Sequence, residues 1–185
     1  MTTEIWATVQ QPNLFPSIYM MERFTRCDHV VIFDQAQFDR DNAQFKLMTS
    51  NGVELKTVEL ENAPHHALFD SRLLHRQEIW ARKTKFSAQT IYGKSMHYRE
   101  LKKWFETVVD AMACKENLTD FCKLSMEAPL RLMGVSTQFI VGSQLIPQRA
   151  EKPGAVFGRL LQTASRNRLR AGIKIHDLVF HQRAV

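Results

Sequence analysis

The sequence predicts an α/β fold in which helices cover a mixed sheet, with an inserted β-hairpin and a helical segment. Short continuous apolar runs, typical of buried strands, alternate with helical patterns along the chain. An Asn51-Gly52 pair between two β-prone runs is typical of a hairpin turn. With 185 residues, 44% of them hydrophobic, the chain is predicted to form one domain over residues 1–185, with 145–185 as its basic C-terminal segment.

The N-terminal third is predicted to hold two strands joined by a loop and a helix. Residues 5–9 form a short apolar run, and the two prolines within residues 11–16 then require an irregular loop. Residues 17–25 are predicted to form a helix, with the serine at the start as its cap. A second apolar run over residues 30–33 predicts a buried strand that ends at Asp34.

The middle of the chain predicts a hairpin followed by helices. Residues 45–48 and 53–60 are expected to form the two hairpin strands. Helical spacing of apolar residues then predicts three helices, and Gly134 is well placed to end the last of them as a left-handed cap. The helices are expected over residues 80–89, 98–112 and 118–133, and a strand is expected over residues 137–141. A basic helix over residues 157–170 and a last strand over residues 173–180 are predicted to follow.

The net charge of +6 belongs entirely to the C-terminal segment. Residues 145–185 contain eight Lys and Arg against two acidic residues, whereas the first 144 residues hold seventeen of each kind. A neutral body with a basic segment favours an anionic partner such as nucleic acid, phosphate or a nucleotide. A solvated helix face that aids solubility explains the same charge equally well.

Several function classes lack support in the sequence. No run of eighteen apolar residues occurs, so no membrane contact is expected, and residues 1–4 do not resemble a signal peptide. The three scattered cysteines are expected to be buried small hydrophobes in a reducing cytoplasm. No P-loop, dinucleotide fingerprint, nucleophile elbow or zinc motif is present, and the adjacent His65 and His66 do not suggest a metal site. The chain is therefore expected to use no cofactor and no metal.

Polar side chains follow the first two predicted strands at the point where each strand ends. The first strand ends at Gln10 and Gln11, and the second ends at Asp34. Ligands of α/β sheets bind at the carboxyl ends of strands, so these residues are predicted to line a site. Their alternative role is to cap loops through local hydrogen bonds. Five polar residues that follow closely have side chains suited to bind a substrate or phosphate: Gln37, Arg40, Asp41, Asn42 and Lys46.

Ordered motifs in this region resemble the signature of the WbqC-like family. The string Gln-Pro-Asn-Leu-Phe-Pro over residues 11–16 resembles its Q-P-x-[FY]-[LF]-P, and residues 28–38 resemble its A-D, apolar run and D-D-V-Q-F. Further family motifs are resembled in the same order over residues 51–58, 80–83, 134–137 and 141–145, so the resemblance spans most of residues 8–145.

This resemblance implies a transferase that attaches a small acyl or aminoacyl unit, such as glycine, to a sugar. It also implies a substrate-binding role for Ser143.

The chain departs from the family pattern at several points. The tryptophan after V-Q-F is missing, Gln35 replaces the second acidic residue, and basic residues stand where the family has a glycine-rich stretch.

Three functions stay open at this level. In the first, a transferase acts on a phosphate-bearing amino-sugar or nucleotide-type acceptor, with Asp34 as general base. In the second, the same pocket modifies a nucleic-acid base, or the chain simply binds DNA. In the third, a non-catalytic binding module has kept the fold. A homo-oligomer is compatible with each of them.

Each function assigns roles to particular side chains. In the transferase, Gln11 and Gln37 would orient the substrate in the catalytic site. The residues that would bind the substrate are Arg40, Asn42, Lys46, Arg82, Lys83 and Ser143. A solvated helix start explains Arg82 and Lys83 equally well. In the nucleic-acid enzyme, the backbone would be bound by Arg159, Arg166, Arg168 and Arg170.

Overall fold

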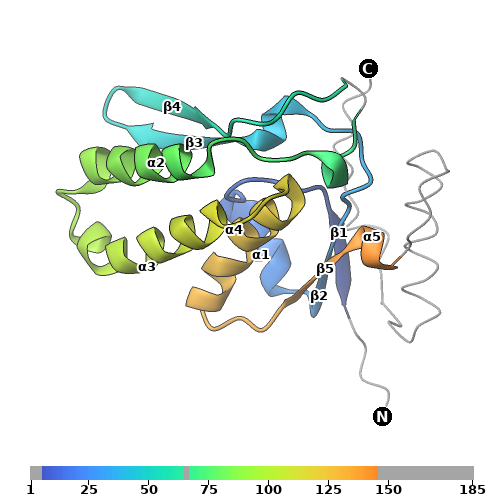
Figure 1. Ribbon diagram of the computed structural model, residues 1–185. Helices are drawn as coiled ribbons and strands as arrows, with labels where there is room; N and C mark the ends of the chain where they lie inside the picture. The colour runs from blue at the N-terminus through green and yellow to red at the C-terminus, as the bar shows by residue number, and fades with distance from the viewer. Residues whose placement is uncertain (1–5, 65–66, 146–185) are drawn as a thin grey trace, which may run out of the picture.

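A computed structural model describes residues 6–64 and 67–145 and confirms the predicted α/β fold (Figure 1). The expected mixed sheet is divided into a parallel three-stranded sheet and a separate two-stranded hairpin. The strands are β1 (Ala7–Gln10), β2 (His29–Ile32), β3 (Gln44–Thr49), β4 (Gly52–Thr57) and β5 (Gln138–Val141). The helices are α1 (Ile18–Thr25), α2 (Gln77–Tyr92), α3 (Met96–Ala113), α4 (Leu118–Leu132) and α5 (Gly142–Leu145), with two 3₁₀ turns, η1 (Arg40–Ala43) and η2 (Phe69–Ser71).

The parallel sheet has the strand order β1-β2-β5. Its register places Gln10 beside Ile32, and Ile32 beside Val141, so the three strands end at one edge. Helices α1 and α4 lie on one side of this sheet (Figure 1). Phe24 of α1 packs edge to face on Phe139 of β5, with ring centroids 5.6 Å apart. The fold therefore brings the loops that follow β1, β2 and β5 together at one edge.

The hairpin is confirmed, but its turn lies one residue earlier than predicted. Thr49 pairs with Gly52, so the turn consists of Ser50 and Asn51, and Gly52 carries the positive φ of 122°. The Thr49 hydroxyl accepts a hydrogen bond from the Asn51 N–H at 3.2 Å and donates to the Gly52 carbonyl at 2.9 Å. This side chain closes the turn and shifts its position. The second strand ends at residue 57 instead of 60, because its partner β3 begins opposite it at Gln44. The Val58 N–H still donates in register to the Ala43 carbonyl at 3.0 Å, but Ala43 belongs to η1.

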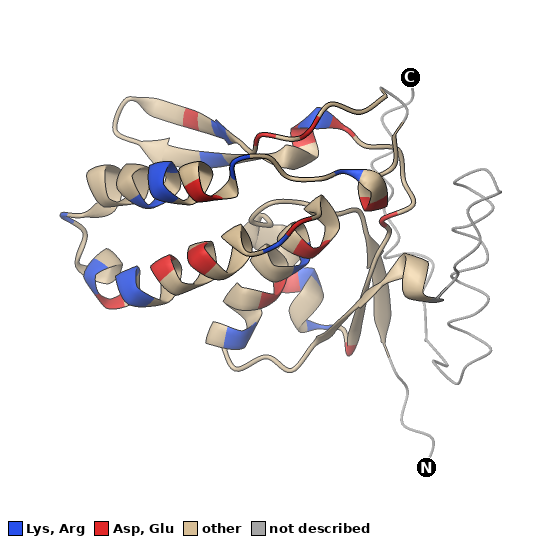
Figure 2. Ribbon diagram, viewed as in Figure 1, with Lys and Arg blue, Asp and Glu red and all other residues tan. Residues whose placement is uncertain are grey.

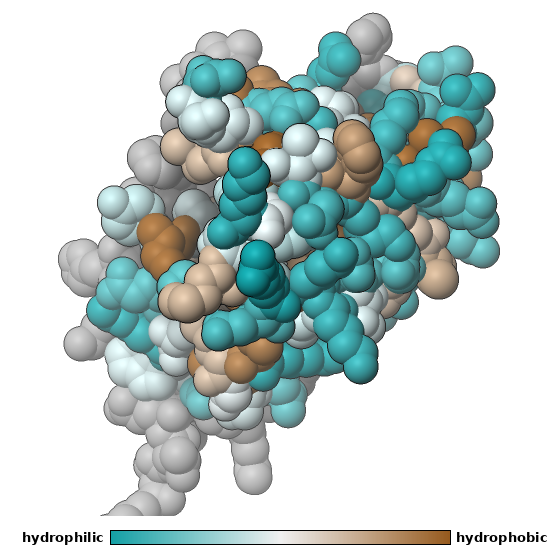
Figure 3. Space-filling view, turned by 90° about the vertical axis from the view of Figure 1, so that its left-hand side faces the viewer, coloured by the Kyte–Doolittle hydropathy of each residue, from teal (hydrophilic) through white to brown (hydrophobic). Residues whose placement is uncertain are grey.

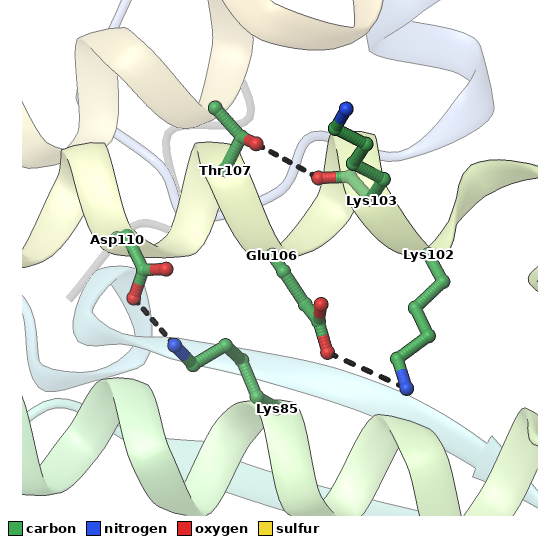
Figure 4. Close-up of polar contacts among 6 residues, drawn as sticks. All are labelled: Lys85, Lys102, Lys103, Glu106, Thr107 and Asp110. Carbon is green, nitrogen blue, oxygen red and sulfur yellow. Dashed lines mark hydrogen bonds and ion pairs between the residues drawn. The ribbon is translucent and has the colours of Figure 1, made fainter.

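Helices α2 and α3 are longer than expected, and α2 begins before the predicted start at Trp80, whereas α4 ends one residue before the predicted residue 133. Arg76 precedes its first turn in the left-handed conformation, with a φ of 53°. At the end of α4, Gly134 has a φ of 74° and its N–H donates to the Arg131 carbonyl, so the predicted cap is confirmed. The Lys85 ammonium lies 2.5 Å from the Asp110 carboxylate between α2 and α3 (Figure 4).

Charged residues of both signs occur along α2 and α3 (Figure 2). Ion pairs such as Lys102 to Glu106, 3.8 Å apart, are exposed, and pairs of this kind contribute little to stability (Figure 4). The left-hand face of the molecule in Figure 1 is mainly hydrophilic, with hydrophobic residues in separate small groups (Figure 3). The stability of this part must therefore come from packing inside the fold.

An aromatic cluster provides that packing. The ring centroid of Phe15 lies 4.9 Å from that of Phe45 in β3, which in turn lies 6.3 Å from that of Trp80 in α2. The ring centroids of Trp80 and of Phe121 in α4 are 4.8 Å apart. The cluster joins the proline-bracketed loop to the hairpin and to two helices. It holds Phe15 in place although its φ of 44° is unusual for a residue with a side chain.

Some predicted elements lie outside the described residues. They are residue 5 of the first predicted strand, His65 and His66, the basic helix over 157–170 and the strand over 173–180. Within the described ranges, none of the helices has the length and apolar character needed to cross a membrane.

The expectation that all three cysteines are buried is wrong for Cys114, which is exposed after the end of α3. Cys27 is half-buried, and Cys122 is buried within α4, where burial raises the pKa of its thiol. We therefore expect a thiol reagent to label Cys114 first and Cys122 only when the protein unfolds. Mass spectrometry of peptides after timed labelling, with and without denaturant, measures this order. Early labelling of Cys122 would contradict the packing of α4.

Candidate functional site

Asp34 lies two residues beyond the end of the central strand β2, and its residue surface is 1% exposed. Its carboxylate accepts two hydrogen bonds from Ser143, one from the backbone N–H at 2.9 Å and one from the hydroxyl at 2.5 Å. Ser143 belongs to α5, which follows β5 without a loop. The neighbouring strands therefore bring together two predicted site residues that are 109 positions apart in the sequence.

The surroundings of Asp34 raise the pKa of its carboxyl group above the ordinary value. Burial is the main cause, since it penalises the charged form, and the negative charge of Asp70 acts in the same direction. The hydrogen bonds from Ser143 and from the Asp34 N–H lower the pKa and only partly compensate. A carboxyl group of this kind exchanges its proton closer to neutral pH than an exposed aspartate does.

A short antiparallel segment brings Asp70 to this site. The Asp70 N–H donates to the Asp34 carbonyl at 3.1 Å, and the Phe69 N–H donates to the Ala36 carbonyl at 3.2 Å. The Phe38 N–H completes the pairing through the Ala67 carbonyl at 3.0 Å. Sequence reasoning missed Asp70 because it lies in an irregular stretch that has no strand or helix periodicity and no motif.

The proline-bracketed loop is tied to the rest of the fold by polar side chains. The Asn42 side chain donates to the Pro12 carbonyl at 3.1 Å. The Ser125 hydroxyl of α4 accepts from the Phe15 N–H and donates to the Asn13 carbonyl, both at 3.2 Å. Asn42 therefore fixes the loop in this structure, and its predicted contact with substrate stays a prediction.

The two glutamines at the end of β1 differ in their surroundings. The Gln10 side chain accepts a hydrogen bond from the half-buried Arg23 of α1, and burial lowers the pKa of that arginine. Gln11 is exposed on the following loop. Gln37 is exposed too, and its backbone forms a bridge with Leu68. Gln11 and Gln37 thus lie on the stretches of chain that follow β1 and β2, and their predicted orienting roles stay predictions.

The predicted cationic residues are dispersed. Arg40 is exposed at the start of η1, and Lys46 is exposed on β3. Arg82 and Lys83 are exposed on α2, which lies on the other side of the view from α5 in Figure 1, so the structure does not bring them to Ser143. The four arginines predicted to bind nucleic acid lie outside the described residues: Arg159, Arg166, Arg168 and Arg170. Among the described residues, no group of three His, Cys, Asp or Glu side chains is arranged to hold a metal ion.

The fold and the site define a class of protein: an α/β protein with a parallel sheet and a buried carboxyl group of raised pKa at the carboxyl ends of its strands. The chain belongs to the WbqC-like protein family, whose model matches residues 11–180. The match extends past residue 145 and includes most of the basic segment. No curated protein and no solved structure matches the chain.

Removal of the Ser143 hydroxyl tests how the site controls Asp34. In Ser143→Ala the backbone N–H remains but the hydroxyl donor is lost, so the pKa of Asp34 is expected to rise further. A Ser143→Thr variant keeps the donor and is expected to leave the pKa near that of the wild type. NMR titration of the Asp34 carboxyl carbon measures the pKa in all three proteins. An unchanged pKa in Ser143→Ala would show that the hydroxyl does not stabilise the carboxylate.

Proposed function

We propose that this protein is a transferase that attaches a small acyl or aminoacyl unit, such as a glycyl group, to a phosphate-bearing amino-sugar or nucleotide-type acceptor. The buried Asp34 carboxyl at the end of the central parallel strand is the observation that carries this proposal. A general base must hold a fixed position and have a pKa closer to the working pH than an ordinary aspartate has. Asp34 meets both conditions, and family membership is consistent with such a role.

The proposed reaction uses Asp34 as the proton acceptor. An amine or hydroxyl of the acceptor attacks the carbonyl carbon of the donor, and its proton passes to the Asp34 carboxylate. A new bond forms between the acceptor nitrogen or oxygen and the acyl carbon, and the bond between that carbon and the leaving group breaks. The leaving group departs with the electron pair of the broken bond and can take the proton back from Asp34. Gln11 and Gln37 orient the acceptor from the loops on either side.

Comparative mass spectrometry of cells tests this function. Nucleotides, sugar nucleotides and DNA are extracted from cells that produce the wild-type protein, the Asp34→Asn variant, or neither. We expect a small metabolite or sugar nucleotide to gain the mass of an acyl or aminoacyl unit only with the wild type. An identical product profile in all three extracts would contradict the proposal.

A second candidate is a nucleic-acid-directed modifying enzyme, favoured by the net charge of +6 within residues 145–185. It predicts that the mass gain appears on DNA or RNA bases in the same experiment. It also predicts that binding of the full chain to oligonucleotides weakens steeply as salt is added, because phosphate contacts release counterions. Binding that is absent or insensitive to salt would exclude this candidate.

A further inference from the structure

Arg72 is a buried arginine in the segment that pairs with residues 34–38, and it has no role in the reaction described above. Its residue surface is 7% exposed. Its backbone is fixed at both ends: the Arg72 N–H donates to the Phe69 carbonyl at 3.1 Å, and the Leu118 N–H donates to the Arg72 carbonyl at 3.0 Å. The side chain therefore starts from a rigid position between η2 and the first turn of α4.

The guanidinium group of Arg72 is held in place but makes little use of its hydrogen-bonding capacity. Its central carbon lies 4.4 Å from the centre of the Phe38 ring. One terminal nitrogen, Nη2, donates a long hydrogen bond of 3.4 Å to the Pro64 carbonyl. Within residues 6–64 and 67–145, the buried Nε–H has no hydrogen-bond partner and no carboxylate forms an ion pair with this group.

This arrangement leaves one buried donor unsatisfied unless a ligand completes it. A guanidinium group has five N–H donors arranged as a planar fork, and Arg72 uses one of them within the described residues. The Phe38 ring stabilises the face of the cation but accepts no bond from the N–H groups at its edge. A buried donor without a partner, as at Nε, is destabilising, whereas an oxyanion can accept two parallel bonds from the fork.

We propose that Arg72 binds a phosphate group of the ligand on which Asp34 acts. The antiparallel pairing supports this, because Asp70 lies beside Asp34 and Arg72 follows Asp70 by two residues. The inference rests on the proposed function in linking the phosphate to the Asp34 substrate. It assigns phosphate binding to a buried arginine, in place of the dispersed surface cations Arg82 and Lys83.

Phosphate binding by the full chain tests the proposal without any turnover. The melting temperature is measured with increasing inorganic phosphate and, in parallel, with sodium chloride at the same ionic strength. We expect phosphate to raise the melting temperature of the wild type above the chloride value, since a ligand that binds only the folded state stabilises it. In Arg72→Met the phosphate affinity is expected to fall roughly tenfold to a hundredfold, the effect of losing charge-assisted hydrogen bonds.

Two further variants separate binding from a structural role. Arg131→Met removes the same charge from an exposed position on α4, where Arg131 pairs with Glu127, and should bind phosphate as the wild type does. Arg72→Lys keeps the charge and the aliphatic stem but loses the planar fork. It is expected to fold even if Arg72→Met does not, and to bind phosphate more weakly than the wild type.

The outcomes are distinct. Wild-type phosphate affinity in Arg72→Met or Arg72→Lys would overturn the proposal and leave Arg72 with a structural role. The absence of phosphate stabilisation in the wild type would overturn it as well. Neither result bears on whether Asp34→Asn abolishes transfer, so failure of this proposal and failure of the proposed function are distinguishable.

Discussion

Asp34→Asn is expected to lower the rate of transfer by about 10²- to 10⁴-fold while leaving the protein at least as stable as the wild type at neutral pH. An asparagine keeps the shape of the side chain and can still accept the hydrogen bond from the Ser143 N–H. It cannot accept a proton from an acceptor group. Because burial is the main reason that the Asp34 pKa is raised, the substitution also removes a destabilising buried charge.

The raised pKa of Asp34 also predicts the direction in which stability changes with pH. The folded-state pKa of Asp34 is raised, so between the unfolded and folded pKa values the folded protein binds more protons than the unfolded chain. The free energy of unfolding contributed by Asp34 therefore falls as pH rises through this interval. The transfer rate is expected to rise over the same interval, because the base must be ionised to act. Asp34→Asn should lack both dependences.

Thermal unfolding across a pH series and rate measurements on the identified product test these expectations. Asp110→Asn is the matched control, since it makes the same chemical change at an exposed ion pair and should alter neither property. Full transfer activity in Asp34→Asn would exclude Asp34 as the base. It would favour a non-catalytic binding module on this fold, whose binding does not depend on proton transfer.

Trp80→Ala is expected to lower the free energy of unfolding by about 3–5 kcal/mol, the range for truncating a large buried aromatic residue. Trp80 is 6% exposed and its ring contacts both Phe45 of β3 and Phe121 of α4. Its removal would leave a cavity where the hairpin, α2 and α4 meet. Because the same cluster supports Phe15, the loop at the end of β1 should lose order as well.

Denaturant unfolding measures this loss, with two variants that separate packing from other effects. Phe86→Ala truncates an aromatic residue on the same helix that is 72% exposed, and should change stability by no more than about 0.5 kcal/mol. Trp80→Phe keeps most of the ring volume and removes an indole N–H that has no hydrogen-bond partner in the described part of the chain. It should cost much less than Trp80→Ala. Equal losses in Trp80→Ala and Phe86→Ala would contradict the packing described here.

Local patterns in the sequence predicted most of the elements because the signals that start and end them are local. Ser17 caps α1 through its side chain, and Gly134 ends α4 in the left-handed conformation, both as predicted. The predictions were wrong at two element ends, one controlled by a neighbouring side chain and one by a backbone conformation that the sequence pattern does not encode. The Thr49 hydroxyl closes the hairpin turn before Asn51-Gly52, and the left-handed Arg76 allows α2 to begin before Trp80.

Asp34, as a polar residue at the end of an apolar strand, was recognisable from the sequence by itself, and so was the resemblance to the WbqC-like family. Only the tertiary structure decided which groups surround that carboxyl. The strand order places Ser143 against Asp34, and an irregular segment brings Asp70 and Arg72 to the same region. The physical reason is that periodicity encodes which face of an element is buried, whereas pKa values and ligand contacts depend on burial and on charges that lie far apart in the chain.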